Sequence, residues 1–278
     1  MEIVSSQLTV LGHPQRLKLF RLLMRRYPDH VTATELAVSL GLKPSTFSNH
    51  ISALMRAGVV TQERRGTSLR YAIEMSAVRT MLDYLIRDCC LGRPDLCRPF
   101  PMPISEEARP VADKRYSVLF ICTGNSARSI FAESILNREG QGRFDVYSAG
   151  TRPNSELNPF ALEVLNDKGY DTSVLRSKNI SEMQTADAPD FDFVFTVCDQ
   201  AANEECPAWQ GQPISAHWGM PDPVKVQGTD AHKSLAFQQA YGALRHRLLA
   251  FSALPFDSLD RISLQKAVDD IGREAVDA

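Results

Sequence analysis

A cysteine and an arginine, separated by five residues, lie between a predicted strand and a predicted helix in this 278-residue chain. Residues 117–121, before the cysteine, are almost all apolar, as in a strand buried within a parallel sheet. Residues 130–137 carry apolar side chains at helical spacing. The segment between them is Cys122-Thr123-Gly124-Asn125-Ser126-Ala127-Arg128-Ser129. A buried strand followed directly by a helix predicts an α/β fold with a parallel sheet.

The composition of this segment is that of a site for a tetrahedral oxyanion. Where a loop leads into a helix, the backbone N–H groups of residues 123–129 can point at such an anion. Arg128 adds a planar pair of donors. The same positive field favours the thiolate of Cys122, because helix N-termini and nearby cations lower the pKa of cysteine. We therefore predict that one loop holds both a nucleophile and its anion site.

This loop resembles that of the low-molecular-weight tyrosine phosphatases and of the arsenate reductases built on the same fold. The resemblance spans roughly residues 114–254 and implies the parallel α/β fold of those enzymes. Further segments that carry it are Tyr147-Ser148-Ala149-Gly150-Thr151, Val194-Phe195-Thr196-Val197-Cys198-Asp199 and His217-Trp218-Gly219-Met220-Pro221-Asp222-Pro223. It implies that Asp222 is the general acid, because a departing oxygen needs a proton that a carboxylic acid on a loop can deliver.

Two more cysteines bear on which reaction this fold performs here. A phosphatase needs only Cys122, Arg128 and Asp222, whereas an arsenate reductase also needs thiols that take over the oxidised sulfur. Cys198 follows an apolar strand, so we expect it at the same sheet edge as Cys122. The resemblance implies a relay from Cys122 through Cys198 to Cys206, and then to thioredoxin. Seven residues separate Cys198 from Cys206, where the reductases commonly have six, so glutaredoxin with glutathione stays open as the reductant.

Two departures from the phosphatase pattern favour the reductase. Ala127 occupies the position where phosphatases usually have a second loop cysteine, and Pro223 is followed by Val-Lys-Val rather than by aromatic residues. We expect no cofactor bound for catalysis.

A departure from the reductase pattern concerns a cation. Some reductases of this fold hold a potassium ion near the loop, and the matching positions here include Asn125, Glu133 and Ser148. The fourth matching position, an aspartate in those enzymes, is Lys178 here. We hypothesise that the ammonium group of Lys178 replaces the cation.

Charge divides the chain into two parts. Residues 1–98 contain 14 Lys and Arg against 8 Asp and Glu, whereas the remaining residues contain 17 against 25. A basic part joined to an acidic part suggests that the first one faces nucleic acid. Between them lies a proline-rich segment without periodicity, as in a semi-rigid tether. We place two domains at residues 1–98 and 115–278, with a linker at 99–114.

The basic part has the pattern of a helix-turn-helix. Apolar residues recur at helical spacing over 13–27, and then Thr32 and Glu35 fit a capping box and Gly41 a helix stop. A second helix over 44–58 carries an apolar stripe and leaves polar residues at its N-terminal end. Such a helix presents its first residues to the major groove of DNA. The predicted base-facing residues are Ser45, Thr46, Ser48, Asn49 and His50.

A hairpin is predicted next, over residues 59–73. Its tip carries Arg64 and Arg65, which would form a basic wing suited to phosphate contacts. Residues 1–98 thus resemble a mainly α, winged helix-turn-helix repressor of the ArsR type. The resemblance implies a homodimer that binds double-stranded operator DNA and releases it when arsenite or antimonite binds. An amphipathic helix over 75–88 is suited to the dimer contact.

Three cysteines near the end of this domain form a candidate metalloid site. Many ArsR-type relatives hold the inducer on a Cys-Val-Cys motif, for which this chain has Ala37-Val38-Ser39. Cys89, Cys90 and Cys97 instead supply three thiols within nine residues. Three sulfurs match the soft, pyramidal coordination of trivalent arsenic or antimony, whereas structural zinc normally takes four protein ligands. We predict that arsenite or antimonite binds here.

The sequence as a whole predicts an arsenic-responsive repressor fused to an arsenate reductase. Two alternatives remain for the second domain: a protein tyrosine phosphatase, or a non-catalytic thiol sensor that modulates DNA binding. No apolar run reaches the roughly 18 residues of a membrane helix, and the N-terminus has no signal pattern. We therefore expect a cytoplasmic protein without a membrane partner.

Overall fold

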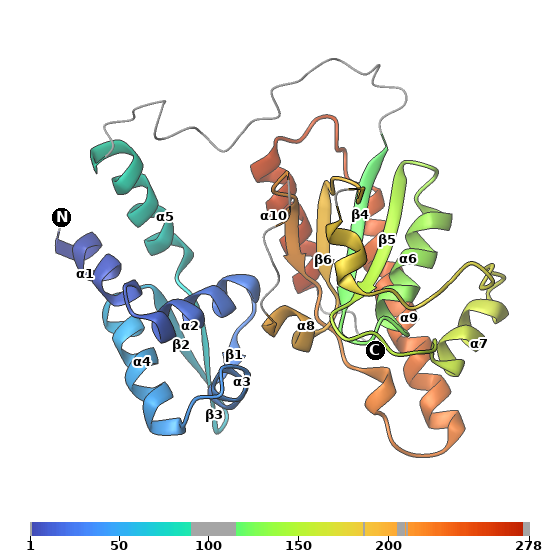
Figure 1. Cartoon of the computed structure of the whole chain (residues 1–278), viewed down its shortest axis with the longest axis horizontal. Coiled ribbons are helices and arrows are strands. Elements are labelled where there is room, and N and C mark those ends of the chain that lie inside the picture. The colour runs from blue at the N-terminus through green and yellow to red at the C-terminus, as the bar shows by residue number, and fades with distance from the viewer. Residues whose placement is uncertain (1, 90–114, 186, 205–208, 210, 275–278) are drawn as a thin grey trace. The chain divides into compact units, whose positions relative to one another are not determined.

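The computed structural model describes residues 2–89, 115–185, 187–204, 209 and 211–274. The chain divides between residues 112 and 113 into two compact units, each with its own core (Figure 1). The predicted linker at 99–114 lies entirely outside the described residues. No helix in the described part of the chain is long and apolar enough to cross a membrane.

The first unit contains the predicted helix-turn-helix and wing. Thr32 caps the first helix of the motif by accepting a hydrogen bond from the Glu35 amide at 3.2 Å, and the Glu35 carboxylate pairs with Arg26 at 2.5 Å. The wing turns at Gly66, whose φ of 60° suits glycine. The elements are α1 Glu2–Leu11, α2 Pro14–Arg25, β1 Val31–Thr32, α3 Ala33–Ser39, α4 Pro44–Arg56, β2 Val60–Arg65, β3 Ser68–Ile73 and α5 Met75–Tyr84, with a π-helical turn Leu85–Cys89.

Two elements of this unit were not predicted. Helix α1 buries only Val4, Gln7 and Val10, and its run of polar residues hides that stripe in the sequence. Strand β1 has two residues and pairs antiparallel with β3, so the small sheet has the order β1-β3-β2. Such a strand is defined by its partner rather than by its own residues.

The second unit is built on a four-stranded parallel sheet of order β5-β4-β6-β7, as the α/β prediction requires. The strands are β4 Tyr116–Cys122, β5 Phe144–Gly150, β6 Phe193–Thr196 and β7 Ile214–His217. The chain moves from β4 outward to β5 and then returns to the other side of β4. Ligands bind at the carboxyl ends of strands where the order reverses in this way. That point lies between β4 and β6, which lead into Cys122 and Cys198.

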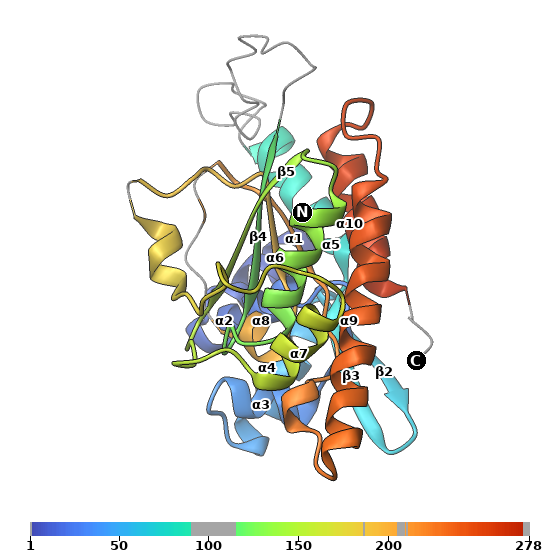
Figure 2. The ribbon, with the colours of Figure 1, turned by 90° about the vertical axis from the view of Figure 1, so that its right-hand side faces the viewer.

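Helices cover the sheet, and three of them line one side of it in Figure 2: α6, α9 and α10. Helix α10 packs on the edge strand β7 and beside α9. The helices are α6 Arg128–Glu139, α7 Pro159–Asp167, α8 Asp199–Asn203, α9 Asp230–Ser252 and α10 Arg261–Arg273, with 3₁₀ turns Ile180–Gln184 and Pro223–Lys225.

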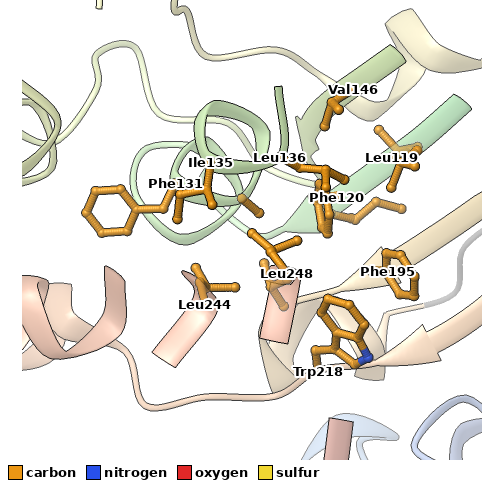
Figure 3. Packing of buried hydrophobic residues seen from close by; sticks show 14 of the residues in the cluster. Leu119, Phe120, Phe131, Ile135, Leu136, Val146, Phe195, Trp218, Leu244 and Leu248 are labelled. Carbon is orange, nitrogen blue, oxygen red and sulfur yellow. The ribbon is translucent and has the colours of Figure 1, made fainter. Parts of the chain in front are cut away.

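The core of this unit forms where α6 and α9 meet the sheet around Phe120 (Figure 3). Phe195 and Trp218 stack with ring centroids 4.2 Å apart, and both are fully buried. Burial of a large aromatic side chain contributes about 1.5–3 kcal/mol to folding. This packing fixes β4, β6 and the segment after β7, the three elements that carry Cys122, Cys198 and Asp222.

Helix α10 carries a carboxyl group whose ionisation opposes folding. Partial burial raises the pKa of Asp269 to about 6, against the lowering effects of Gln265 and Arg273. The folded protein therefore holds a proton that the unfolded chain has lost between about pH 4 and 6, and stability falls as pH rises through that window.

We expect Asp269→Asn to raise the free energy of unfolding by about 1 kcal/mol at pH 7.5, a value reduced for the exposed part of the side chain. At pH 5, midway through that window, the gain should be about half as large. Urea unfolding at the two pH values measures it. An equal gain at both would show that the Asp269 charge is not its cause.

Candidate active site

The predicted oxyanion loop, residues 122–129 and hereafter the cradle loop, has its carbonyl groups held on one side by residues 151–158. The carbonyls of Cys122, Thr123, Gly124 and Ser126 accept hydrogen bonds from the amides of Thr151, Arg152, Asn154 and Asn158 at 3.1, 2.9, 2.9 and 3.0 Å. In a trans peptide the next N–H points away from the carbonyl. The loop amides therefore turn to the opposite side, where an anion can lie.

Asn125 fixes the turn of the cradle loop. Its φ of 42° lies in the left-handed region, which asparagine tolerates better than most residues. The side chain is fully buried and donates to Ser129 and Ser148 at 2.9 and 2.8 Å. Gly150 is needed beside it, because a Cβ there would come within 2.7 Å of the Thr123 carbonyl oxygen.

The Cys122 thiol lies at the end of β4, inside the cradle loop. Its Sγ is 2.9 Å from the Ser129 hydroxyl and accepts a hydrogen bond from the Asn125 amide at 3.1 Å. Burial raises the pKa of Cys122, and the nearby Cys198 raises it further, although Ser129, Arg128 and the Asn125 amide act in the other direction. The prediction of a lowered pKa was therefore wrong, because desolvation of the thiol outweighs the positive field.

Because the pKa of Cys122 is raised, the alkylation rate of this thiol should depend on pH. A thiol with a raised pKa stays protonated at neutral pH, so its alkylation rate should rise about tenfold per pH unit from pH 7 to 9. We expect that slope for iodoacetamide at Cys122, followed by mass spectrometry of the Cys122 peptide, with the exposed Cys89 as the internal comparison. A rate that stays constant from pH 7 to 9 would show that the thiolate already predominates at pH 7.

Arg128 and Asp222, far apart in the sequence, meet beside the cradle loop. Arg128 is the first residue of α6, and its Nη2 is 2.8 Å from the Asp222 carboxylate. Its Nη1 donates to the Met220 carbonyl at 3.2 Å. The Asp222 side chain also accepts a hydrogen bond from the Val224 amide at 3.2 Å. The guanidinium group is thus oriented by the loop that carries the predicted acid, and an oxyanion would compete with that carboxylate for Arg128.

Cys198 is a second buried thiol next to the cradle loop. It follows β6 and caps α8, where its Sγ accepts a hydrogen bond from the Ala201 amide at 3.4 Å. The same sulfur is 3.4 Å from the hydroxyl of Thr123. The expectation that Cys198 and Cys122 lie at one edge of the sheet is therefore met. Cys206 lies outside the described residues.

The four positions matched to a potassium site form one buried network behind the loop. Lys178 Nζ contacts the Glu133 carboxylate oxygens at 3.0 and 2.8 Å, and both side chains are about nine-tenths buried. Ser148 donates to Glu133 at 2.6 Å, and the Lys178 amide donates to the Asn125 side chain at 2.6 Å. The Lys178 ammonium group thus lies beside the Glu133 carboxylate, which supports the Asn125 side chain through Ser148.

The predicted DNA-facing residues lie on α4 and the wing of the first unit. Ser45, Ser48 and Asn49 are exposed, while Thr46 and His50 are half-buried. The His50 ring is 4.7 Å from that of His13, centroid to centroid, and the pKa of His50 is lowered, chiefly by burial.

The wing arginines are both exposed, and Arg65 pairs with Glu63 at 2.5 Å. Of the three predicted metalloid ligands, Cys89 is exposed at the end of the π-helical turn, whereas Cys90 and Cys97 lie outside the described residues. Within the described part of the chain, no group of three or more His, Cys, Asp or Glu side chains could hold a metal ion.

The supporting segment at residues 151–158 was missed from the sequence. Its backbone amides carry the function, so side-chain chemistry gave no direct signal. Asn154 is an exception, because its side-chain amide donates to the Ser126 hydroxyl at 3.0 Å and lies against Gly124. The run Tyr147–Thr151, which leads into this segment, was the available sign that the region belongs to the site.

Comparison with known proteins matches each unit separately. The family model for low molecular weight phosphotyrosine protein phosphatase matches residues 117–261, and a helix-turn-helix domain model matches residues 11–63. Arsenate reductases of Halalkalibacterium halodurans and of Bacillus subtilis are each 35% identical over 135 residues, which is 49% of this chain and 94% of theirs. A solved arsenate reductase in the phosphate binding state is 27% identical, with a TM-score of 0.40 over 50% of this chain and 97% of that one. The chain therefore belongs to the low molecular weight phosphotyrosine protein phosphatase family, and a helix-turn-helix domain precedes its family domain.

Proposed function

We propose that the family domain reduces arsenate to arsenite through a relay of cysteine thiols. The observation that carries this proposal is the buried Cys198 thiol, 3.4 Å from the Thr123 hydroxyl at the cradle loop. Phosphate-ester hydrolysis by Cys122, Arg128 and Asp222 has no need of this thiol, whereas arsenate reduction requires a second sulfur to supply electrons. The named relatives in the comparison are arsenate reductases.

The first step is attack on arsenic(V) by the Cys122 thiolate, which forms when the thiol passes its proton to an arsenate oxygen. Arg128 and the cradle-loop amides hold the arsenate oxygens, and Asp222 donates a proton to the oxygen that leaves as water. A Cys122 sulfur–arsenic bond forms as the arsenic–oxygen bond breaks, without a change in oxidation state.

Reduction occurs when the Cys198 thiolate attacks the sulfur of Cys122. A disulfide forms between the two cysteines, the sulfur–arsenic bond breaks, and its electron pair leaves with arsenic as arsenite. Cys206 would then attack Cys198, which frees Cys122 and moves the disulfide to the 198–206 pair. An external dithiol, thioredoxin or glutaredoxin with glutathione, returns two electrons.

The test is arsenate-dependent NADPH oxidation with thioredoxin and thioredoxin reductase, and in parallel with glutaredoxin, glutathione and glutathione reductase. We expect turnover in wild type, none above background in Cys198→Ser, and wild-type turnover in the matched control Cys89→Ser. Failure of wild type with both reductants would contradict the proposal.

A protein tyrosine phosphatase is the second candidate, favoured by the family match and by the meeting of Cys122, Arg128 and Asp222. Hydrolysis of an aryl phosphate that is equal in wild type and Cys198→Ser, together with no arsenate turnover, would support it. Absence of both activities would favour a thiol sensor.

For the first unit we propose a homodimeric repressor that arsenite or antimonite releases from operator DNA. The helix-turn-helix match and the exposed polar end of α4 support DNA binding. Helices α1 and α5, together with the turn after α5, expose Ile3, Leu8, Leu82 and Ile86, an apolar surface suited to a second copy.

Selection of duplexes from a random pool should enrich an inverted repeat, since a two-fold dimer reads two half-sites.

Arsenite should release the enriched duplex from wild type but not from a variant with Cys89, Cys90 and Cys97 changed to serine. Release from that variant at the same arsenite concentration would contradict the three-cysteine site.

A further inference from the structure

Helix α10 begins at Arg261, the residue at which the match to the family model ends. It nevertheless packs against the segment that leads to the predicted acid. We call residues 218–222, between β7 and the 3₁₀ turn Pro223–Lys225, the acid loop.

Contacts between α10 and the start of the acid loop are close and polar. The indole N–H of the fully buried Trp218 donates to the Val268 carbonyl at 2.9 Å. Gln265 donates to the Ser215 carbonyl on β7 at 2.8 Å. A Cβ on Gly272 would come within 2.7 Å of the Trp218 ring, so this glycine allows the helix to approach that closely. One face of α10 therefore holds both β7 and the first residue of the acid loop.

Arg247, a buried arginine on α9, joins the end of α10 to the next residue of the loop. Its Nη1 donates to the Gly219 carbonyl at 3.2 Å, and its Nη2 to the Glu274 carbonyl, at the C-cap of α10, at 3.5 Å. Arg247 as a whole is 7% exposed. It binds two backbone carbonyls from different elements, which a point charge such as lysine does less well.

The following residues of the acid loop contact the site directly. The Met220 carbonyl accepts from Arg128, and Asp222 pairs with the same guanidinium group at 2.8 Å. A continuous set of contacts therefore runs from α10 and Arg247 through Trp218 and Gly219 to the predicted acid.

We propose that α10 and Arg247 form a clamp that positions the acid loop for proton donation by Asp222. The proposal rests on the acid role assigned to Asp222 above. Arg247 is a positioning residue, since it acts through the Gly219 carbonyl and is not placed at the reacting atoms. A displacement of the acid by about 1 Å can lower a rate by about a hundredfold.

The test compares Arg247→Met and Arg247→Lys with Arg245→Met, a matched control on the same helix whose arginine pairs with Glu139 at 2.8 Å. We expect Arg247→Met to lower kcat for arsenate about ten- to hundredfold while KM stays within about twofold. Arg247→Lys should recover part of the loss, and the control should match wild type.

A double-mutant cycle separates positioning of Asp222 from general destabilisation. In a protein that already carries Asp222→Asn, adding Arg247→Met should lower kcat by less than about a further twofold, because both changes remove the same proton donation. If the kcat losses of the two single variants multiplied in the double variant, the clamp proposal would be wrong.

Hydrogen exchange needs no turnover. It therefore tests whether α10 and Arg247 hold the acid loop even if the reductase proposal fails. Trp218→Phe keeps an aromatic ring against Phe195 but removes the indole donor and part of the ring volume. It is a second variant that loosens the same contact, for the case that the Arg247 variants unfold. We expect the amides of the non-proline residues in 219–226 to exchange at least tenfold faster in Arg247→Met and Trp218→Phe, with unchanged exchange in β4. Unchanged exchange at 219–226 in both variants would overturn the proposal.

Discussion

Arg128→Lys is expected to lower kcat for arsenate by about a hundred- to thousandfold, the range measured when one oxyanion donor is removed from an enzyme. In the structure the two terminal nitrogens of Arg128 bind different partners, the Met220 carbonyl at 3.2 Å and the Asp222 carboxylate at 2.8 Å. A lysine ammonium keeps the charge but not the planar pair of donors. It therefore cannot hold two oxygens of one oxyanion in the same orientation.

Steady-state kinetics of arsenate reduction measures this effect. The matched control is Arg138→Lys on the same helix α6, whose side chain lies over the Tyr170 ring, away from the cradle loop. We expect the control to retain wild-type kcat. A loss below about threefold in Arg128→Lys would show that charge alone is sufficient, and the two-donor account of the site would be wrong.

Lys178→Met should lower the free energy of unfolding of the second unit by about 3–5 kcal/mol, the usual effect of breaking a buried ion pair. The Glu133 side chain is 12% exposed, and its carboxylate contacts the Lys178 ammonium group at 2.8 Å. Without the lysine it would remain as a buried charge, and the hydrogen bond that it accepts from Ser148 would not compensate. Asn125 would lose support as well, so turnover should fall with stability.

The double variant Lys178→Met/Glu133→Gln is the control, because it removes both charges and keeps an acceptor for Ser148. Urea unfolding should show most of the lost stability restored. If the ammonium group replaces a bound cation, potassium in place of sodium should leave wild-type turnover unchanged and should partly rescue Lys178→Met. Potassium activation of wild type, or a loss below about 1 kcal/mol in the single variant, would contradict this role.

Much of the fold was predictable because its signals are local. The apolar run at 117–121 and the helical spacing at 130–137 correspond to β4 and α6, and the polar start of the second motif helix corresponds to the exposed end of α4. Other elements depend on partners distant in the sequence. Strand β1 exists through its pairing with β3, and α10 lies beyond the resemblance, which stopped near residue 254.

The site was predictable in its residue types but not in its energetics. The cradle loop and Asp222 were predicted from motifs, and the structure brings Arg128 to Asp222 across 94 positions. The pKa of Cys122 was predicted in the wrong direction, because the degree of burial follows from the packing of the whole sheet. The carbonyl contacts of residues 151–158 are backbone interactions, and no side-chain motif encodes them.

The most direct test of the thiol relay is a single turnover without external reductant. Reduced protein is mixed with excess arsenate and then denatured, so that arsenite held by thiols is also counted, and disulfides are mapped by mass spectrometry. We predict one arsenite per chain, the loss of two thiols, and a disulfide that includes Cys198. Cys198→Ser should give no arsenite. An equal arsenite yield in Cys198→Ser, or none in wild type, would contradict the proposal that Cys122 and Cys198 together reduce arsenate.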